Sequence, residues 1–239
     1  MEIQRITGLG DLEMVLTPDS YRVACNCGRQ HPVLVKRVVI EPAAMERFEQ
    51  QRQLAGLPAD YCAVYDQNTW EATRGRRLPA PHTVILEPEG LHASEAGVQQ
   101  LLEQRPATAM RVAVGSGTLH DITRYCAAQR GLAFASVPTA CSVDGFASQT
   151  ASMTLKGMKV TVPAVAPALI VADTDILAAA PWRLTCSGVG DIIGKYIALA
   201  DWKISHLLTG EYYCEAIPGL PRAPVQQVGT CCPRPNEGD

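Results

Sequence analysis

The sequence predicts an α/β protein, in which a Rossmann-like parallel-sheet domain is followed by the beginning of an all-helical domain. Three observations predict it. Short β-branched runs alternate with helix-length segments up to about residue 174, a glycine turn joins one such run to a helix at residues 115–118, and only helical patterns follow residue 174. We therefore expect a nucleotide-binding domain over residues 1–174, the start of a helical domain over 175–217, and a Pro-, Gly- and Cys-rich tail over 218–239.

The elements follow from periodicity and from turn residues. The first 35 residues have an extended, turn-rich pattern, with short alternating segments at 21–24 and 33–35. Strands are expected at 36–40, 60–65, 83–86, 110–114, 133–137, 155–162 and 168–172. Helices are expected at 43–54, 70–77, 94–103, 121–129, 175–180 and 190–208. Strands that alternate with helices at this spacing favour a parallel sheet with crossover helices.

Composition excludes several classes of protein. The 239 residues carry 24 acidic and 21 basic side chains, a net charge of −3, so no basic field is available for nucleic acid. No apolar run approaches the roughly 20 residues that span a bilayer. The N-terminal residues lack the apolar stretch of a secretory signal, which leads us to expect a cytoplasmic protein.

The nine cysteines do not resemble a disulfide framework, because their number is odd and the chain is long. Cys62, Cys126 and Cys186 stand among apolar or small residues and are expected to be buried, reduced thiols. Cys25, Cys27 and His31 are candidate zinc ligands, although no fourth ligand is evident and the spacing is unusual for zinc. A hairpin that turns at Gly28 is the favoured interpretation of that segment.

The glycine turn is the strongest candidate for a phosphate site. A β-branched strand leads into Gly115-Ser-Gly-Thr118 and then into a helix. Glycines allow the backbone to approach a pyrophosphate, and the helix N-terminus supplies N–H groups and a partial positive charge. An ordinary strand-to-helix turn is the alternative, because Gly-x-Gly alone is a weak signal.

Three aspartates are candidates for binding or catalysis, and each has a structural alternative. Asp66 ends a strand, where a carboxylate either accepts hydrogen bonds from a ribose or caps a turn. Asp144 lies in a polar loop. Asp191 stands where Gly190-Asp191 is expected to open a helix, so an N-cap or first-turn role is its alternative.

Taken together, these motifs resemble the sn-glycerol-1-phosphate dehydrogenase family. That family belongs to the superfamily of iron-containing alcohol dehydrogenase, glycerol dehydrogenase and dehydroquinate synthase. The resemblance rests on Asp66-x-Asn-Thr, Gly115-Ser-Gly-Thr-x-x-Asp121, Val137-Pro-Thr-x-x-Ser-x-Asp-Gly-x-Ala-Ser148, residues 173–181, Gly188-x-Gly-Asp191, and the segment that begins Ala200-Asp-Trp-Lys. It covers roughly residues 20 to 217.

The resemblance implies a cleft between the two domains that holds NAD(H) or NADP(H), a divalent metal ion and substrate. It assigns the adenosine ribose to Asp66, contact with substrate to Asp144, and both metal ligation and substrate contact to Asp191. The implied pyrophosphate-binding residues are Gly115, Ser116, Gly117, Thr118 and Leu119, and those lining the nicotinamide side are Thr139, Ser142 and Ser148. The implied reaction is the reduction of dihydroxyacetone phosphate to sn-glycerol 1-phosphate, with zinc or nickel as Lewis acid.

The sequence departs from the family after Asp191. Members complete the metal site with two downstream histidines, but His206 is the only histidine after Asp191 and precedes the region of those ligands. One carboxylate is a poor zinc or nickel site. We hypothesise that truncation or a changed reading frame ends the family pattern after Ile217. The apolar face of residues 192–208 would then be exposed, and association through it, including a homo-oligomer, is expected.

Two alternatives to a working dehydrogenase therefore stay open. One is a non-catalytic remnant that binds a nucleotide. The other is a lyase of the dehydroquinate synthase type, which is disfavoured because those proteins typically carry a glutamate at the position of Asp191.

Overall fold

A computed structural model describes residues 14–17, 27–29, 31–104 and 107–216. The strands are β1 (Met14–Leu16), β2 (Arg37–Glu41), β3 (Tyr61–Asp66), β4 (His82–Leu86), β5 (Met110–Gly115), β6 (Ala133–Pro138), β7 (Thr150–Leu155), β8 (Met158–Pro163) and β9 (Leu169–Asp173). The helices are η3 (Ala44–Arg47), α1 (Phe48–Leu54), α2 (Gln67–Ala72), α3 (Glu95–Glu103), α4 (Gly117–Gln129), η4 (Gly145–Ala147), α5 (Thr174–Ala179) and α6 (Trp182–Thr209).

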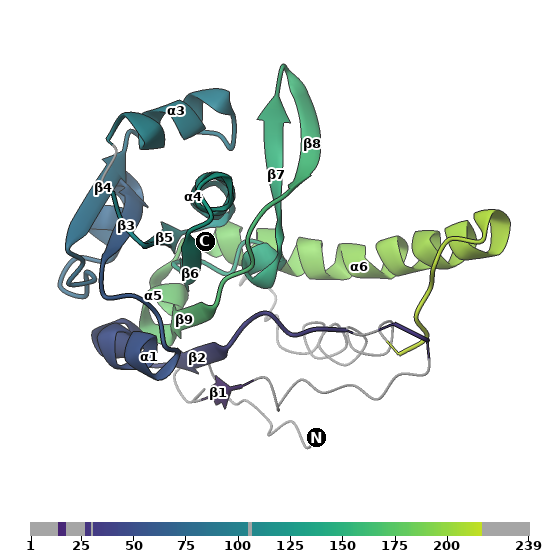
Figure 1. Cartoon of the computed structure of the whole chain (residues 1–239), viewed down its shortest axis with the longest axis horizontal. Coiled ribbons are helices and arrows are strands. Elements are labelled where there is room, and N and C mark those ends of the chain that lie inside the picture. The colour runs from purple at the N-terminus through teal and green to yellow at the C-terminus, as the bar shows by residue number, and fades with distance from the viewer. Residues whose placement is uncertain (1–13, 18–26, 30, 105–106, 217–239) are drawn as a thin grey trace, which may run out of the picture.

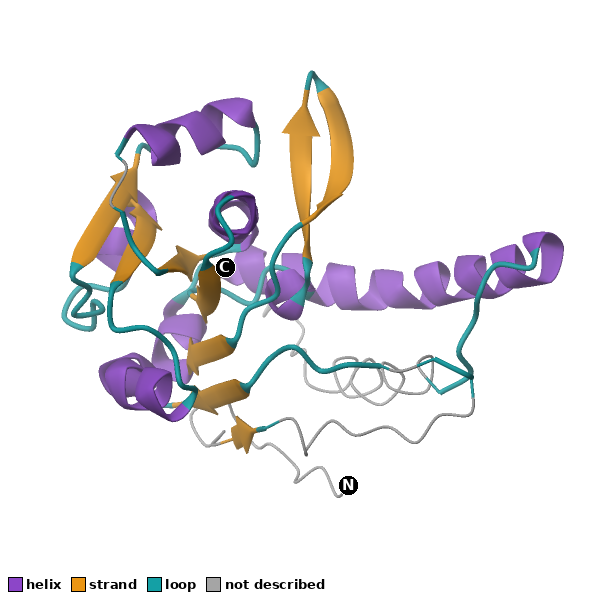
Figure 2. Cartoon of the chain, viewed as in Figure 1, coloured by secondary structure: helices purple, strands orange, loops and turns teal. Residues whose placement is uncertain are grey.

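Seven strands form one sheet in the order β1-β2-β9-β6-β5-β3-β4, and only β1 pairs antiparallel (Figures 1 and 2). The expected α/β fold with a parallel sheet is confirmed. Parallel strands are covered on both faces by their crossover helices, which is why β3, β5, β6 and β9 are almost wholly buried.

The two faces of the sheet have separate cores. On one face, Val112 and Val114 of β5 pack in a cluster with Phe48 of α1 and Ile176 of α5. On the other face, side chains of β3 and β4 pack against α3 and α4 in a cluster that includes Ile122. Because side chains alternate along a strand, the same β-branched runs supply both cores.

Residues 150–163 form a hairpin, which corrects the single strand expected at 155–162. Strands β7 and β8 pair antiparallel from Thr150↔Pro163 to Leu155↔Met158. Lys156 and Gly157 have φ angles of 52° and 75°. Two successive residues with positive φ make the tight turn that matches the twist of a hairpin.

Helix α6 begins earlier than expected. It runs for 28 residues from Trp182, directly after Pro181, to Thr209, and its C-cap is Gly210, whose φ is 72°. Asp191 therefore lies within this helix and not at its N-terminus, so its interpretation as an N-cap or first-turn acid is wrong. Gly188 and Gly190 weaken the helical pattern of the sequence. Gly188 is explained by its close contact with the backbone of Cys141.

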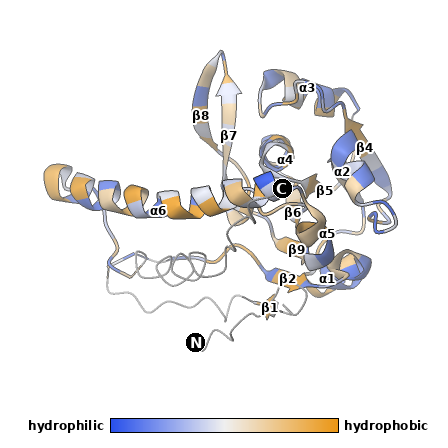
Figure 3. Cartoon of the chain, turned by 180° about the vertical axis from the view of Figure 1, so that it is seen from behind, coloured by the Kyte–Doolittle hydropathy of each residue, from blue (hydrophilic) through white to orange (hydrophobic). Residues whose placement is uncertain are grey.

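The far part of α6 projects beyond the sheet with an apolar surface (Figures 1 and 3). Ile197, Leu207 and Leu208 are 68%, 71% and 80% exposed. The expected exposure of this helix is confirmed. Within the described ranges, no helix combines the length and hydropathy needed to cross a membrane.

Several smaller expectations are also corrected. Helix α2 starts at Gln67 because Asp66 caps it, and α4 starts at Gly117, four residues before the expected position. Cys62 and Cys126 are buried as expected, but Cys186 is exposed on α6. The chain bends at Gly28 (φ 77°), yet no strand flanks this bend within residues 27–29 and 31–36. Residues 21–24, Cys25 and the tail 218–239 lie outside the described residues.

Candidate functional site

The turn between β5 and α4 is shaped by a close approach at Gly115. A Cβ atom on this residue would lie 2.3 Å from Cδ1 of Leu119, so a side chain here would force Leu119 to move. Ser116 occupies the N-cap position of the 13-residue helix α4, yet no side chain caps the first turn. The amides of Gly117 and Thr118 open that first turn at the positive end of the helix dipole. The turn is therefore suited to binding an anion.

The loop after β6 lies directly over this turn. The amide of Thr139 donates a hydrogen bond to the carbonyl of Gly115 at 2.9 Å. The hydroxyls of Ser142 and Ser116 share a short hydrogen bond. Thr139 and Ser142 are both buried. The structure thus brings together the predicted pyrophosphate residues and two of the three predicted nicotinamide-side residues.

Asp144 and Asp191 meet at the edge of the same loop. The amide of Asp144 donates a hydrogen bond to Oδ2 of Asp191 at 2.8 Å. The Asp144 carboxylate in turn pairs with Nζ of Lys195 at 2.8 Å, and both side chains are partly exposed. This hydrogen bond to Asp144 raises the pKa of Lys195, which keeps the lysine cationic. Two carboxylates and one ammonium group form a compact polar cluster.

Gly188 allows α6 to carry Asp191 up to this loop. A Cβ atom at position 188 would lie 1.8 Å from the carbonyl oxygen of Cys141, which rules out any side chain there. Residues three or four apart share a helix face, so Asp191 projects toward the loop that Gly188 touches. Lys195 follows four residues after Asp191 on the same face.

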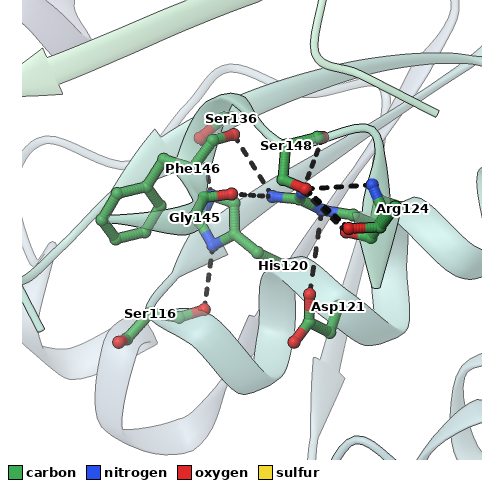
Figure 4. A network of polar contacts seen from close by, with 9 residues as sticks. Ser116, His120, Asp121, Arg124, Ser136, Gly145, Phe146 and Ser148 are labelled. Atoms are coloured by element: carbon green, nitrogen blue, oxygen red, sulfur yellow. Dashed lines mark hydrogen bonds and ion pairs between the residues drawn. The ribbon is translucent and has the colours of Figure 1, made fainter. Parts of the chain in front are cut away.

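Arg124 of α4 holds the loop that bears Asp144 (Figure 4). Its guanidinium is buried and donates hydrogen bonds to the carbonyls of Gly145 (3.0 Å), Phe146 (3.2 Å), Ser148 (2.6 Å) and Thr150 (3.2 Å). Its Nε lies 3.9 Å from a carboxylate oxygen of Asp121. Four carbonyls on one charged group fix the backbone from η4 to the start of β7.

His120 links the glycine turn to strand β6 in the same view (Figure 4). Its Nδ1 lies 2.9 Å from the carbonyl of Ser116, and its Nε2 lies 2.7 Å from the hydroxyl of Ser136. Complete burial lowers the pKa of His120 to about 3. The neutral imidazole therefore serves as a fixed structural bridge under the turn.

Asp66 lies at the same edge of the sheet as Gly115. Each stands two residues beyond the paired residues Val64 and Ala113 of adjacent parallel strands. The carboxylate of Asp66 accepts a hydrogen bond from the amide of Thr69 at 2.7 Å, which completes a capping box. Asp66 therefore caps helix α2, and one of its carboxylate oxygens makes this contact.

Ser148, the third predicted nicotinamide-side residue, lies away from the glycine turn. Its hydroxyl contacts the hydroxyl of Thr150 at 2.9 Å, and both residues line an open hollow of about 570 Å³ that also borders His31.

Asp191 is not surrounded by further metal ligands in the part of the chain that the structure describes. Among the described residues, no group of three or more potential metal ligands includes Asp144 or Asp191. His206 lies 15 residues farther along α6, about 22 Å at the rise of an α-helix, and its Nδ1 contacts the carbonyl of Glu211 at 2.6 Å. The described side chains therefore do not fit a three-ligand zinc or nickel site here.

Sequence reasoning missed Lys195, Arg124 and His120. The spacing of four residues from Asp191 was a signal for Lys195, once a continuous helix was assumed. No sequence signal distinguishes a buried arginine or histidine in α4 from an exposed one.

Comparison with known proteins agrees with the fold and the motifs. Glycerol-1-phosphate dehydrogenase (NAD(P)+) of Bacillus licheniformis is 40% identical over 216 residues, which cover 85% of this chain and 54% of that protein. The protein of the same name from Geobacillus stearothermophilus is 41% identical over 220 residues, 87% of this chain and 53% of the relative. The chain thus spans about half the length of the curated relatives it matches.

Solved structures share the fold. Glycerol dehydrogenase of Schizosaccharomyces pombe superposes with a TM-score of 0.54 at 24% identity, over 65% of this chain and 41% of that one. An iron-containing alcohol dehydrogenase of Thermotoga maritima superposes with a TM-score of 0.56 at 14% identity. The superposition covers 69% of this chain and 53% of that one. The iron-containing alcohol dehydrogenase family itself matches residues 39–181. The chain therefore belongs to the iron-containing alcohol dehydrogenase family.

Proposed function

We propose that this chain forms the nucleotide-binding part of an NAD(P)H-dependent oxidoreductase that reduces dihydroxyacetone phosphate to sn-glycerol 1-phosphate. The observation that carries the proposal is the hydrogen bond between Asp144 and Asp191, which joins the two residues that we propose to bind substrate. Relatives that are 40% and 41% identical carry the name of this enzyme. Residues 1–174, 175–217 and 218–239 remain our proposed division of the chain.

The nucleotide would lie along the carboxyl edge of the sheet. Gly115, Ser116, Gly117, Thr118 and Leu119 would hold its pyrophosphate, because the uncapped first turn of α4 suits an anion. The free oxygen of Asp66 would accept a ribose hydroxyl. Thr139 and Ser142 would line the nicotinamide side next to the glycine turn, and Ser148 would do so from the far end of the same loop. Bound there, the nicotinamide supplies the hydride, and the choice between NADH and NADPH stays open.

The cluster of Asp144, Asp191 and Lys195 would bind the substrate. Carboxylates accept hydrogen bonds from the hydroxyls of a triose phosphate, and the ammonium group attracts its phosphate. With a raised pKa, Lys195 holds its proton near neutral pH, so we assign it a positioning role and not proton donation. The resemblance makes Asp191 a ligand of a divalent metal ion, zinc or nickel. We derive no step through that ion because the described residues do not complete its site.

We further propose a cytoplasmic protein that associates with a second copy of itself. The exposed apolar side chains of α6, among them Ile197 and Leu207, supply a surface for such association.

A nucleotide-binding protein without turnover is the second candidate. The observation that favours it is the lack of a three-ligand metal group around Asp191 within the described part of the chain. Such a protein would use the glycine turn but would not convert dihydroxyacetone phosphate.

One experiment separates the two. The purified full chain is titrated with NADH and NADPH, and is then assayed with dihydroxyacetone phosphate and zinc or nickel at the nicotinamide absorbance. Turnover that disappears in Asp191→Asn supports the enzyme and defeats the second candidate. Binding without turnover supports the second candidate, and a lack of nucleotide binding contradicts both.

A further inference from the structure

Two cysteines and a histidine from opposite ends of the described chain lie close together. Cys27 and His31 precede β2, whereas Cys214 follows the C-terminal end of α6. Sγ of Cys27 lies 3.2 Å from Nε2 of His31, and Sγ of Cys214 lies 3.5 Å from the same nitrogen. The three donor atoms all lie within 4.8 Å of one another.

These distances match those between ligands of one tetrahedral zinc ion. Bond lengths of about 2.3 Å to sulfur and about 2.0–2.1 Å to nitrogen place a sulfur and a nitrogen ligand about 3.5 Å apart, and two sulfurs about 3.8 Å apart. The observed contacts of 3.2 and 3.5 Å need little adjustment to accept the ion. Two thiolates and an imidazole are ligands that favour zinc over magnesium or calcium.

The turn that carries Cys214 is held firmly against α6. Nε1 of Trp202 donates a hydrogen bond to the carbonyl of Tyr212 at 2.7 Å, and the rings of Trp202 and Tyr213 lie 4.6 Å apart. Cys214 itself is buried, so its position is set by packing and not by a free tail.

Outer groups support a negatively charged thiolate. The hydroxyl of Tyr212 lies 3.0 Å from Sγ of Cys27, and the guanidinium of Arg29 stacks 3.7 Å over the Tyr212 ring. Such partners orient first-shell ligands and tune the affinity of a metal site. His31 is exposed, so an ion can reach the site from solvent.

We propose that Cys27, His31 and Cys214 bind a zinc-type divalent cation, and that the ion ties the segment before β2 to the turn after α6. This site is separate from the Asp144–Asp191 cluster and does not depend on the proposed dehydrogenase function. Binding displaces protons from the thiols and from His31, so affinity should fall as the pH is lowered.

The test uses the full chain, reduced and freed of metal by a chelator, and titrated with Co²⁺ as a spectroscopic probe. We expect a thiolate-to-cobalt charge-transfer band and the visible bands of a tetrahedral ion, at one ion per chain, displaced by Zn²⁺. Cys27→Ser, Cys214→Ser and His31→Gln should each weaken binding at least about 100-fold, and Tyr212→Phe about tenfold. Cys186→Ser, at an exposed cysteine on α6, is the matched control and should bind normally.

Circular dichroism of each variant checks that the fold is retained. Because Asp191→Asn leaves the three ligands intact, it should keep the cobalt–thiolate band, which separates this site from any metal at the dehydrogenase cluster. The proposal is overturned if reduced wild-type protein shows no charge-transfer band, or if the band survives in the Cys27→Ser/Cys214→Ser double variant. A Cys27–Cys214 disulfide that forms readily in protein unable to bind cobalt would also overturn it.

Discussion

The amide of Asp144 donates a hydrogen bond to the carboxylate of Asp191 across 47 residues of sequence, at a distance of 2.8 Å. Each aspartate alone has an ordinary structural explanation. Their contact places two carboxylates and Lys195 beside the loop that covers the glycine turn. We propose that the nucleotide binds at α4 and that the substrate binds at this cluster, and this assignment rests on that contact.

Asp144→Asn and Asp191→Asn should therefore separate binding from turnover. The amide side chains keep the size of the carboxylates but remove the charge, so we expect NADH affinity to change less than about twofold. Where the enzyme turns over, kcat should fall by roughly 100-fold, the order for loss of one charged group at a reacting centre. Isothermal titration and a nicotinamide assay measure the two effects, and a large loss of NADH affinity would contradict the assigned roles.

Lys195→Met should weaken substrate binding without unfolding the protein. The ion pair with Asp144 is partly exposed, so its loss should cost no more than about 1 kcal/mol of unfolding free energy. We expect KM for dihydroxyacetone phosphate to rise about tenfold, since the positive charge of the cluster is lost. Lys203→Met is the matched control, because Lys203 forms a similar ion pair with Glu215 away from the cluster. An equal change of KM in both variants would count against the role of Lys195.

Gly188→Ala should destabilise the contact between α6 and the loop at Cys141. The added Cβ would meet a backbone oxygen at 1.8 Å, which neither partner relieves without a shift of the helix. Overpacking of this kind costs about 1–3 kcal/mol. Gly194→Ala lies in the same helix with open space around the new atom and should stabilise by up to about 1 kcal/mol. Urea unfolding compares the two, and similar stabilities would show that the close approach is wrong.

Arg124→Met should loosen the loop from Gly145 to Thr150. The variant removes hydrogen bonds to four carbonyls and leaves them under a methionine that cannot donate, so we expect a loss of about 3–5 kcal/mol of unfolding free energy. Arg130→Met, at the exposed C-cap of the same helix, should cost far less. Hydrogen exchange should report faster exchange in this loop only for the first variant.

His120 should make the protein sensitive to acid. Its pKa is about 3 in the folded protein and near the ordinary value of 6.5 when unfolded, so the unfolded state binds more protons between these values. The stability that neutral His120 provides is fully present above pH 6.5 and declines as the pH falls toward 3. The unfolding free energy should drop with a slope approaching about 1.4 kcal/mol per pH unit. His120→Gln should remove this slope, and an unchanged pH profile would refute the assignment.

Local sequence patterns predicted most of the sheet. The apolar runs at β3, β5 and β9 are buried on both faces, which is the environment that selects such residues. The glycine turn was also predictable, since the close approach at Gly115 involves a neighbour only four residues away. The hairpin turn at Lys156 was missed because its positive φ is unusual for lysine.

Features set by distant contacts were not predictable. Gly188 is tolerated inside α6 because the carbonyl of Cys141 occupies the space of its side chain, a contact that no helical pattern reveals. The meeting of Cys214 with His31 joins residues 183 positions apart. The hydrogen bonds of Arg124 likewise depend on the tertiary path of the 145–150 loop.

The central claim is that α4 presents its N-terminus to the nucleotide. The NADH affinity of the Gly117→Asp variant tests this claim most directly. A side chain at position 117 meets only ordinary contact with Val143, and an aspartate in the first turn favours the helix while repelling a pyrophosphate. We predict at least a tenfold weaker NADH affinity, about 1.4 kcal/mol, for Gly117→Asp, and a much smaller change for Gly117→Ala. NADH affinity of Gly117→Asp equal to that of the wild-type chain would contradict the account.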